Sequence, residues 1–280
     1  WVSPAPGGDG RKGSLSANRT RSAGVRGFAF AGFLLLLAPP ESGGAADADG
    51  WALDIGGDRA AVTLGETRTA WWTGRVQLGW RREGTGGAFV AVEPLRRFDA
   101  TDTTFIAAGW RHAGPWSAYA EVGATPRADF HYRRSGELEL FRRAGDGPWV
   151  AHCAARLLAY RGQDVRLISP RVTRYGARSE IHARLYLVRN TTLGTGSRAA
   201  LLRGHYDVRP RLRGGAGVAK GERIFDVTAL PREPAPGWVV FADARLGVGH
   251  RDSVGIVFRI AEEGSSFDQA AVGLSYRRTF

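Results

Sequence analysis

The segment SEIHARLYLVRN, residues 179 to 190, decides the fold because its polarity alternates from one residue to the next. In an extended chain, successive side chains point to opposite faces, so this segment has an apolar face and a polar face. The apolar face carries Ile181, Ala183, Leu185 and Leu187, and the polar face carries Glu180, His182, Arg184 and Tyr186. This period of two predicts a β-strand.

The same pattern recurs along the chain after residue 50, in segments of roughly ten residues that end at Gly, Pro, Asp or Asn. The next segment, ALLRGHYDVR at 200–209, repeats it with apolar residues opposite arginine, histidine and aspartate. Further examples occur at 72–81, 116–122, 240–246 and 256–260. Serial segments of this kind predict an all-β protein, a transmembrane up-and-down antiparallel β-barrel.

A soluble β-sandwich also alternates, so the composition of the polar face must separate the two folds. Here that face repeatedly combines arginine with glutamate, aspartate, histidine and tyrosine, a mixture that suits a crowded interior where guanidinium groups pair with carboxylates. Tryptophans near the predicted strand ends are typical of the interfacial girdle of a membrane barrel. They are Trp71, Trp72, Trp80, Trp110, Trp116, Trp149 and Trp238.

Turn-forming sequences set the number of strands. They occur at 114–115, 145–148, 191–197 and 231–237. With these turns we expect about fourteen strands, or about twelve if weak strands merge, and both counts satisfy the even number that bacterial barrels of this kind require.

The last strand, VGLSYRRTF at 272–280, is expected to pair with the first strand and close the barrel. Its apolar face ends on the aromatic residue Phe280, as does the signal that the barrel-assembly machinery reads in outer-membrane proteins. We therefore assign Leu274, Tyr276 and Phe280 to an assembly signal and expect that machinery as a partner during biogenesis. Arg278 departs from this pattern.

The amino-terminal region has the features of a secretory signal peptide. GFAFAGFLLLLA at 27–38 is too short to span a bilayer as a helix, follows arginines and precedes small residues. Because the chain contains no methionine, we expect translation to begin at Val25. Residues 1–24 are then untranslated, 25–48 form the signal peptide, and 49–280 form the barrel domain in the outer membrane of a Gram-negative bacterium.

Residues 51–280 resemble the YaiO family of outer-membrane β-barrels. The resemblance rests on RRFDATD at 96–102, on the segment 157–190, on LLRGHYD at 201–207 and on the closing GLSYRRTF. It implies an outer-membrane location, a barrel fold and a role connected with surface polysaccharide. It brings no catalytic residue.

Charge gives the main functional hypothesis. The formal net charge is +12, almost all of it from arginine. No basic helix, zinc-ligand spacing or aromatic RNA-binding motif accompanies this charge, so no nucleic-acid partner is expected. Arginines at loop tips would instead meet the phosphates of lipopolysaccharide, and the outer wall would meet membrane lipid.

Arginines on the predicted inner face would attract an anionic or polysaccharide ligand. They are Arg75, Arg81, Arg156, Arg184, Arg203, Arg209, Arg245 and Arg259. Alternatively, carboxylates on the same face would pair with them and plug the lumen. These are Glu121, Glu137, Glu139, Glu180, Asp207 and Asp243.

An enzyme that modifies lipid or polysaccharide is the alternative from another class. Its histidines would have to face lipid, whereas the alternation places His182 and His205 on the polar face; His152 and His250 complete the candidates. The sequence has no GxSxG or HExxH motif and no metal-ligand spacing. We therefore expect no enzymatic activity, no cofactor and no metal. Cys153 is the single cysteine, which rules out an internal disulfide.

Overall fold

The computed structural model describes residues 49–222, 236–264 and 267–280. The expectations for residues 1–48, an untranslated segment and a signal peptide, lie outside this part of the chain, as does most of the turn predicted at 231–237. Within the described ranges, no helix is long and apolar enough to cross a membrane.

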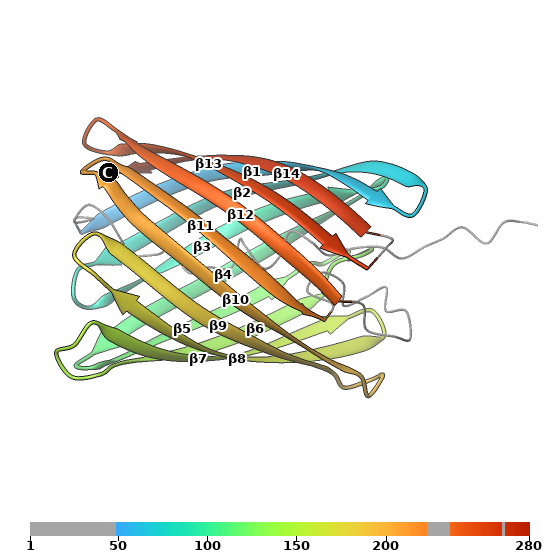
Figure 1. Ribbon diagram of the computed structural model, residues 1–280, viewed down its shortest axis with the longest axis horizontal. Helices are drawn as coiled ribbons and strands as arrows, with labels where there is room; N and C mark the ends of the chain where they lie inside the picture. Colours follow the sequence, from blue (N-terminus) through green and yellow to red (C-terminus); the bar gives the residue numbers. More distant parts are fainter. Residues whose placement is uncertain (1–48, 223–235, 265–266) are drawn as a thin grey trace, which may run out of the picture.

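The described residues form a closed antiparallel barrel of fourteen strands, which confirms the predicted fold and the higher of the two strand counts (Figure 1). The strands are β1 (Gly50–Leu64), β2 (Thr67–Arg82), β3 (Gly86–Arg97), β4 (Ala100–Ala113), β5 (Trp116–Ala124), β6 (Arg134–Arg143), β7 (Trp149–Tyr160), β8 (Gln163–Tyr175), β9 (Ser179–Asn190), β10 (Gly196–Arg209), β11 (Leu212–Glu222), β12 (Pro236–Val248), β13 (Asp252–Glu263) and β14 (Phe267–Thr279).

Each strand pairs with its neighbours in sequence, and β14 returns to pair with β1. The closing register runs from Ala52 opposite Thr279 to Leu64 opposite Phe267. Beyond it, the backbone N–H of Phe280 donates a hydrogen bond to the carbonyl of Trp51 at 2.9 Å. The last strand therefore closes the barrel as its alternation predicted.

Both ends of the barrel domain lie on the same rim, and the connections on that rim are short turns, the longest being 144–148. The opposite rim carries the longer segment 125–133. In bacterial outer-membrane barrels, the short turns face the periplasm and the longer loops face the cell exterior. We name the two rims periplasmic and extracellular accordingly.

The outer wall is apolar, as a lipid-facing surface must be, because lipid cannot satisfy polar groups. Leu185, for example, is 52% exposed and Leu202 53% exposed on this wall. The alternation assigned from sequence is confirmed in β9: its apolar residues face out, and Glu180, His182 and Arg184 are buried inside.

The tryptophan girdle is only partly as predicted. Five of the seven tryptophans are exposed on the outer wall; they are Trp72, Trp80, Trp116, Trp149 and Trp238. Trp71 is instead 4% exposed inside the barrel, and Trp110 packs inward against the cluster around Phe89. Trp71 cannot share a face with Trp72, since adjacent residues of a strand point in opposite directions.

Arginines stack on aromatic rings at the periplasmic rim. The guanidinium carbon of Arg142 lies 5.1 Å from the ring centroid of Trp116, and that of Arg278 lies 5.9 Å from the centroid of Phe280. Cation–π contact allows an arginine to remain beside the aromatic belt. Arg278, which departs from the expected carboxy-terminal pattern, thus covers the ring of Phe280.

Candidate functional site

The inner wall of the barrel carries seven of the eight arginines proposed to face the lumen. They are Arg75, Arg81, Arg156, Arg184, Arg203, Arg245 and Arg259. Arg209 is placed differently: it is exposed at the periplasmic end of β10, beyond a register shift between Asp207 and Arg209. A bulge of this kind interrupts the alternation on which the assignment rested.

The inner faces of β3 to β9, here called the packed half, are filled by paired charges. Arg156 lies between two carboxylates, with Nη2 3.2 Å from Glu121 and Nη1 3.3 Å from Glu137. Arg75 of β2 reaches across to Glu93 of β3 and forms a close ion pair and hydrogen bond. The side chains of these pairs are almost wholly buried, except that Arg75 is 16% exposed, so the charges compensate one another inside the barrel.

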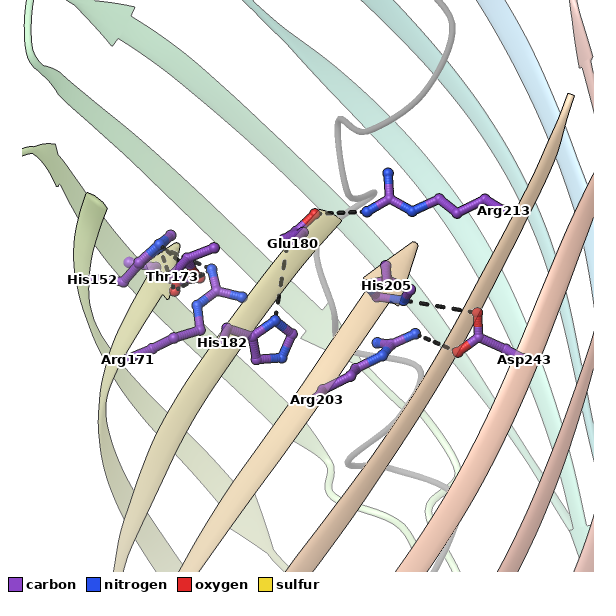
Figure 2. Close-up of polar contacts among 10 residues, drawn as sticks. His152, Arg171, Thr173, Glu180, His182, Arg203, His205, Arg213 and Asp243 are labelled. Carbon is purple, nitrogen blue, oxygen red and sulfur yellow. Dashed lines mark hydrogen bonds and ion pairs between the residues drawn. The ribbon is translucent and has the colours of Figure 1, made fainter. Parts of the chain in front are cut away.

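A second group of contacts extends this network around β7 and β8 (Figure 2). Arg171 donates to Glu139 at 3.1 Å and lies 2.9 Å from Nδ1 of His152. The Nε2 atom of His152 lies 3.1 Å from the hydroxyl of Thr173. Arg171 and Glu93 were not among the residues singled out from the sequence, although both fall on the inward phase of their strands.

The segment 125–133 turns into the lumen at the extracellular rim of the packed half. Asp102, which is fully buried, accepts hydrogen bonds from the backbone N–H groups of Asp129, Phe130 and His131, at 2.9, 3.0 and 2.7 Å. Tyr132 is 0% exposed and packs with Leu158, Tyr160 and Val165. One carboxylate thus anchors three consecutive backbone donors, and alternation gave no signal for this segment.

Burial lowers the pKa of His131 well below its ordinary value, because an apolar environment disfavours the imidazolium, and the nearby Arg97 and Arg156 act in the same direction. The guanidinium of Arg97 stacks on Trp71 at 4.5 Å and on Phe130 at 5.5 Å. Arg97 therefore joins the inserted segment to the apolar cluster that includes Trp71.

That cluster covers the extracellular side of β10 to β14, β1 and β2, here called the cavity half. Trp71 and Phe241 are its largest buried members. Phe241 can lie across the wall because a Cβ on Gly217, the inward residue of the neighbouring strand, would collide with its ring. The described residues at the extracellular rim therefore fill both halves of the lumen with apolar and aromatic side chains.

Towards the periplasmic rim, the cavity half contains a cavity of about 310 Å³. Small residues on the inner wall leave this space; they include Gly56, Gly255, Ala271, Gly273 and Ser275. The charged lining comprises Arg75, Arg203, Arg213, Arg245, Arg259, Asp54, Asp58 and Asp243, and His205 completes it. The lining thus holds five arginines against three aspartates, and two of these arginines, Arg75 and Arg213, have their carboxylate partners, Glu93 and Glu180, outside it.

Most of these arginines have carboxylate partners (Figure 2). Arg203 donates to Asp243 at 2.9 Å, and Nε2 of His205 lies 3.7 Å from the same carboxylate. Arg213 donates to Glu180 at 2.7 Å. Arg203 also lies over the ring of Phe241, at 5.3 Å. Arginines from different strands thus line one space while held by separate carboxylates.

The histidines considered for catalysis do not face lipid. His152, His182 and His205 are buried on the inner wall, and His250 lies in a periplasmic turn. No group of three or more His, Cys, Asp or Glu side chains that could hold a metal occurs among the described residues. The wall that a lipid-modifying enzyme would use therefore lacks the candidate histidines.

The three residues of the predicted assembly signal lie on β14 and at the chain end. Leu274 and Phe280 are exposed on the outer wall, at 65% and 59%. The hydroxyl of Tyr276 donates to Asp252 at 2.5 Å. Recognition by an assembly machinery remains a prediction.

Comparison with known proteins supports the fold and leaves the family open. No protein-family model matches the chain, and no curated protein shows significant sequence similarity. The YaiO resemblance is therefore not shown.

Solved structures with the same fold include the "CymD monoaromatic hydrocarbon channel", with a TM-score of 0.59, 10% identity, and coverage of 83% of this chain and 89% of that one. A "bacterial polysaccharide outer membrane secretin" has a TM-score of 0.60 at 9% identity, covering 84% and 99%. An outer-membrane channel from Pseudomonas putida F1 has a TM-score of 0.52 at 10% identity, covering 86% and 99%.

These likenesses concern the fold alone, because the identities are so low. Together with the closed fourteen-stranded sheet, the apolar outer wall and the polar interior, they define an outer-membrane β-barrel. The protein is located in the outer membrane.

Proposed function

We propose that the barrel passes or displays an anionic ligand derived from polysaccharide, and that the cavity on the periplasmic side receives it. The observation that carries this proposal is the gathering of five arginines from different strands in the lining of one cavity. A summed positive field in a narrow, low-dielectric space attracts anions and opposes cations.

Two resemblances support the polysaccharide part of the proposal. The chain resembles the YaiO family in the segments given above, and membership of that family would connect it with surface polysaccharide. One of the solved structures with the same fold is described as a polysaccharide secretin. A charged lining suits such a ligand better than the uncharged hydrocarbon named for CymD.

A closed, structural barrel is the second candidate, and the filled extracellular rim favours it. The inserted segment 125–133 and the cluster around Trp71 both occupy the lumen there. Passage therefore requires the segment 125–133 or the cluster around Trp71 to move out of the lumen. A role as an enzyme has no comparable support, since the buried histidines face away from lipid.

Planar-bilayer recording of the purified protein tests the proposal. We expect channels whose reversal potential in a salt gradient indicates preference for anions, and a shift towards cations in Arg203→Ala. Arg189→Ala, which removes an exposed arginine from the extracellular end of β9, is the matched control and should leave the preference unchanged. Complete absence of conductance from correctly folded protein would favour the closed barrel.

A further inference from the structure

Four cationic side chains lie together on the outer wall, at the extracellular ends of the adjacent strands β8, β9, β10 and β11. All four are on the outward phase of their strands and exposed; they are Arg166, Arg189, Arg198 and Lys220, here called the basic patch. Within the part of the chain that the structure describes, none of their side chains forms an ion pair or contacts an aromatic ring. Their charges are therefore accessible to a partner outside the chain.

The strand register holds these cations close to one another. Arg166 and Arg189 are directly opposite in the β8–β9 pair, where like charges destabilise a sheet. Arg198 of β10 lies one diagonal step from Arg189, and Lys220 of β11 lies one diagonal step from Arg198. Neighbouring strands are about 4.8 Å apart, so the patch extends about 14 Å across the four strands. A bound anion would relieve the repulsion within it.

The basic patch marks the extracellular edge of the apolar band. On each of the four strands, the next outward residue towards the periplasm is apolar; these residues are Ile168, Leu187, Ala200 and Val218. The strands are tilted (Figure 1), by roughly 35–45° in barrels of this kind, so residues at one depth are offset along successive strands, as these cations are. They therefore lie where the hydrocarbon ends and the phosphates of the lipid head groups begin.

Carboxylates near the basic patch are fewer than its cations. Asp164 lies on the same face of β8, and Glu222 lies on the same face of β11. Two carboxylates against four cations leave this part of the wall positive. The extracellular ends of β13 and β14 instead carry the opposed carboxylates of Glu262 and Asp268 on the outer wall. The extracellular end of the wall is therefore not uniformly basic.

Outer-wall arginines at the periplasmic rim are in a different environment. Arg142 lies over the ring of Trp116 at 5.1 Å, and Arg174 lies over the ring of Trp149 at 5.9 Å. These rings stabilise the two cations within the protein itself. The basic patch has no such contact among the described residues, so its stabilisation must come from the membrane that it faces.

We propose that the basic patch binds the phosphates of lipid A, the membrane anchor of lipopolysaccharide in the outer leaflet. Lipid A has a phosphate at each end of a disaccharide, and its acyl chains would lie along the apolar wall below the patch. Guanidinium groups bind phosphate oxygens through paired hydrogen bonds, and clustered basic residues recognise lipid head groups. The site lies outside the lumen, so the loss of Arg189 should affect lipid A binding and leave the anion preference of a channel unchanged.

Native mass spectrometry of the purified protein in detergent tests the site, with lipid A, its dephosphorylated form and phosphatidylglycerol as probes. We expect lipid A to bind at least about tenfold more tightly than the dephosphorylated lipid, which keeps the acyl chains but lacks the charges. Phosphatidylglycerol, with one phosphate, should bind more weakly than lipid A, and equal binding would overturn the assignment to lipid A. Equal binding of the dephosphorylated lipid, or no binding of lipid A to the folded protein, would overturn the inference.

Variants that remove charge locate the contact. Arg166→Gln combined with Arg189→Gln should weaken lipid A binding by about tenfold or more. Arg142→Gln combined with Arg174→Gln removes the same charge from the periplasmic rim of the outer wall; this matched control should bind lipid A as the wild type does. Equal weakening in both double variants would show attraction by net charge alone and contradict the site. Altered gel migration of the unheated protein verifies that each variant is folded.

Urea unfolding in vesicles separates lipid binding from a structural role. In phosphatidylcholine vesicles, the Arg166→Gln and Arg189→Gln double variant should unfold at the same urea concentration as the wild type or a higher one, because the substitutions remove opposed like charges. When lipid A is added to the vesicles, the midpoint of the wild type should rise and that of the double variant should rise less. An equal rise in both proteins would overturn the role of these arginines.

Discussion

The two halves of the lumen use the same residue types in opposite ways. In the packed half, Arg156 and Arg171 fill the interior and meet carboxylates one or two strands away at 3.1 to 3.3 Å. In the cavity half, glycine, alanine and serine occupy many of the inward positions, so the arginines there stand around an open space. The difference shows that the size of the intervening side chains, as well as the number of charges, decides whether an arginine-rich wall becomes a core or a site.

The largest expected effect comes from removing an arginine of the packed half. Arg156→Ala leaves Glu121 and Glu137 buried without the guanidinium between them, and should lower the free energy of unfolding by about 3 to 5 kcal/mol. Arg203→Ala, in the cavity half, should cost only about 1 kcal/mol, because its partner Asp243 is partly exposed. Urea unfolding in lipid vesicles measures both. Equal costs would remove the distinction between the halves.

Charged substitutions on the outer wall should cost about the same free energy of unfolding in both halves. Leu185→Arg on β9 and Leu202→Arg on β10 each place a charge in lipid near the middle of a strand, and each should cost about 2 to 4 kcal/mol. Leu193→Arg, in an extracellular turn, is the control and should cost little. If Leu185→Arg and Ala183→Arg were both silent in the same unfolding assay, the assignment of inner and outer faces would be inverted.

The next largest effect is expected from Asp102, which anchors segment 125–133. Asp102→Asn replaces one acceptor oxygen by an N–H donor and weakens the bonds to the backbone of residues 129–131, at a cost of about 1 to 3 kcal/mol. Release of this segment should raise the conductance in planar bilayers. Asp99→Asn, in an exposed turn, should have no effect. An unchanged conductance in Asp102→Asn would show that this segment does not close the lumen.

The smallest effect is a pH dependence from His131. Its lowered pKa means that the folded protein keeps the imidazole neutral, while the unfolded chain binds a proton near pH 6.5. Stability from this group is therefore complete above that pH and falls as the pH is lowered through it, by at most about 1.4 kcal/mol per pH unit. Between pH 7 and 5, the unfolding free energy of His131→Gln should depend less steeply on pH than that of the wild type. The difference should correspond to the uptake of about one proton on unfolding.

Much of the barrel was predictable because the period of two is a local property. The alternation in β9 and β10 correctly assigned Leu185 and Leu202 to the outer wall. The prediction failed at Arg209, where a bulge interrupts the period of two. It also failed at Trp71, which was assigned to the girdle because it is a tryptophan, although its position in the alternation points inward. The inserted segment 125–133 has no period, so its anchor at Asp102 was not foreseen.

The sequence by itself determined that the chain forms alternating strands, which side of each strand meets lipid, and that the last strand closes the sheet. The tertiary structure decided which charges meet. Arg259 approaches Asp58 across an intervening strand, and Arg213 reaches Glu180 across β10. Such partners depend on the closure of the barrel, on the register of its strands and on small residues between the two charges. The alternation within a single strand contains no information about any of these.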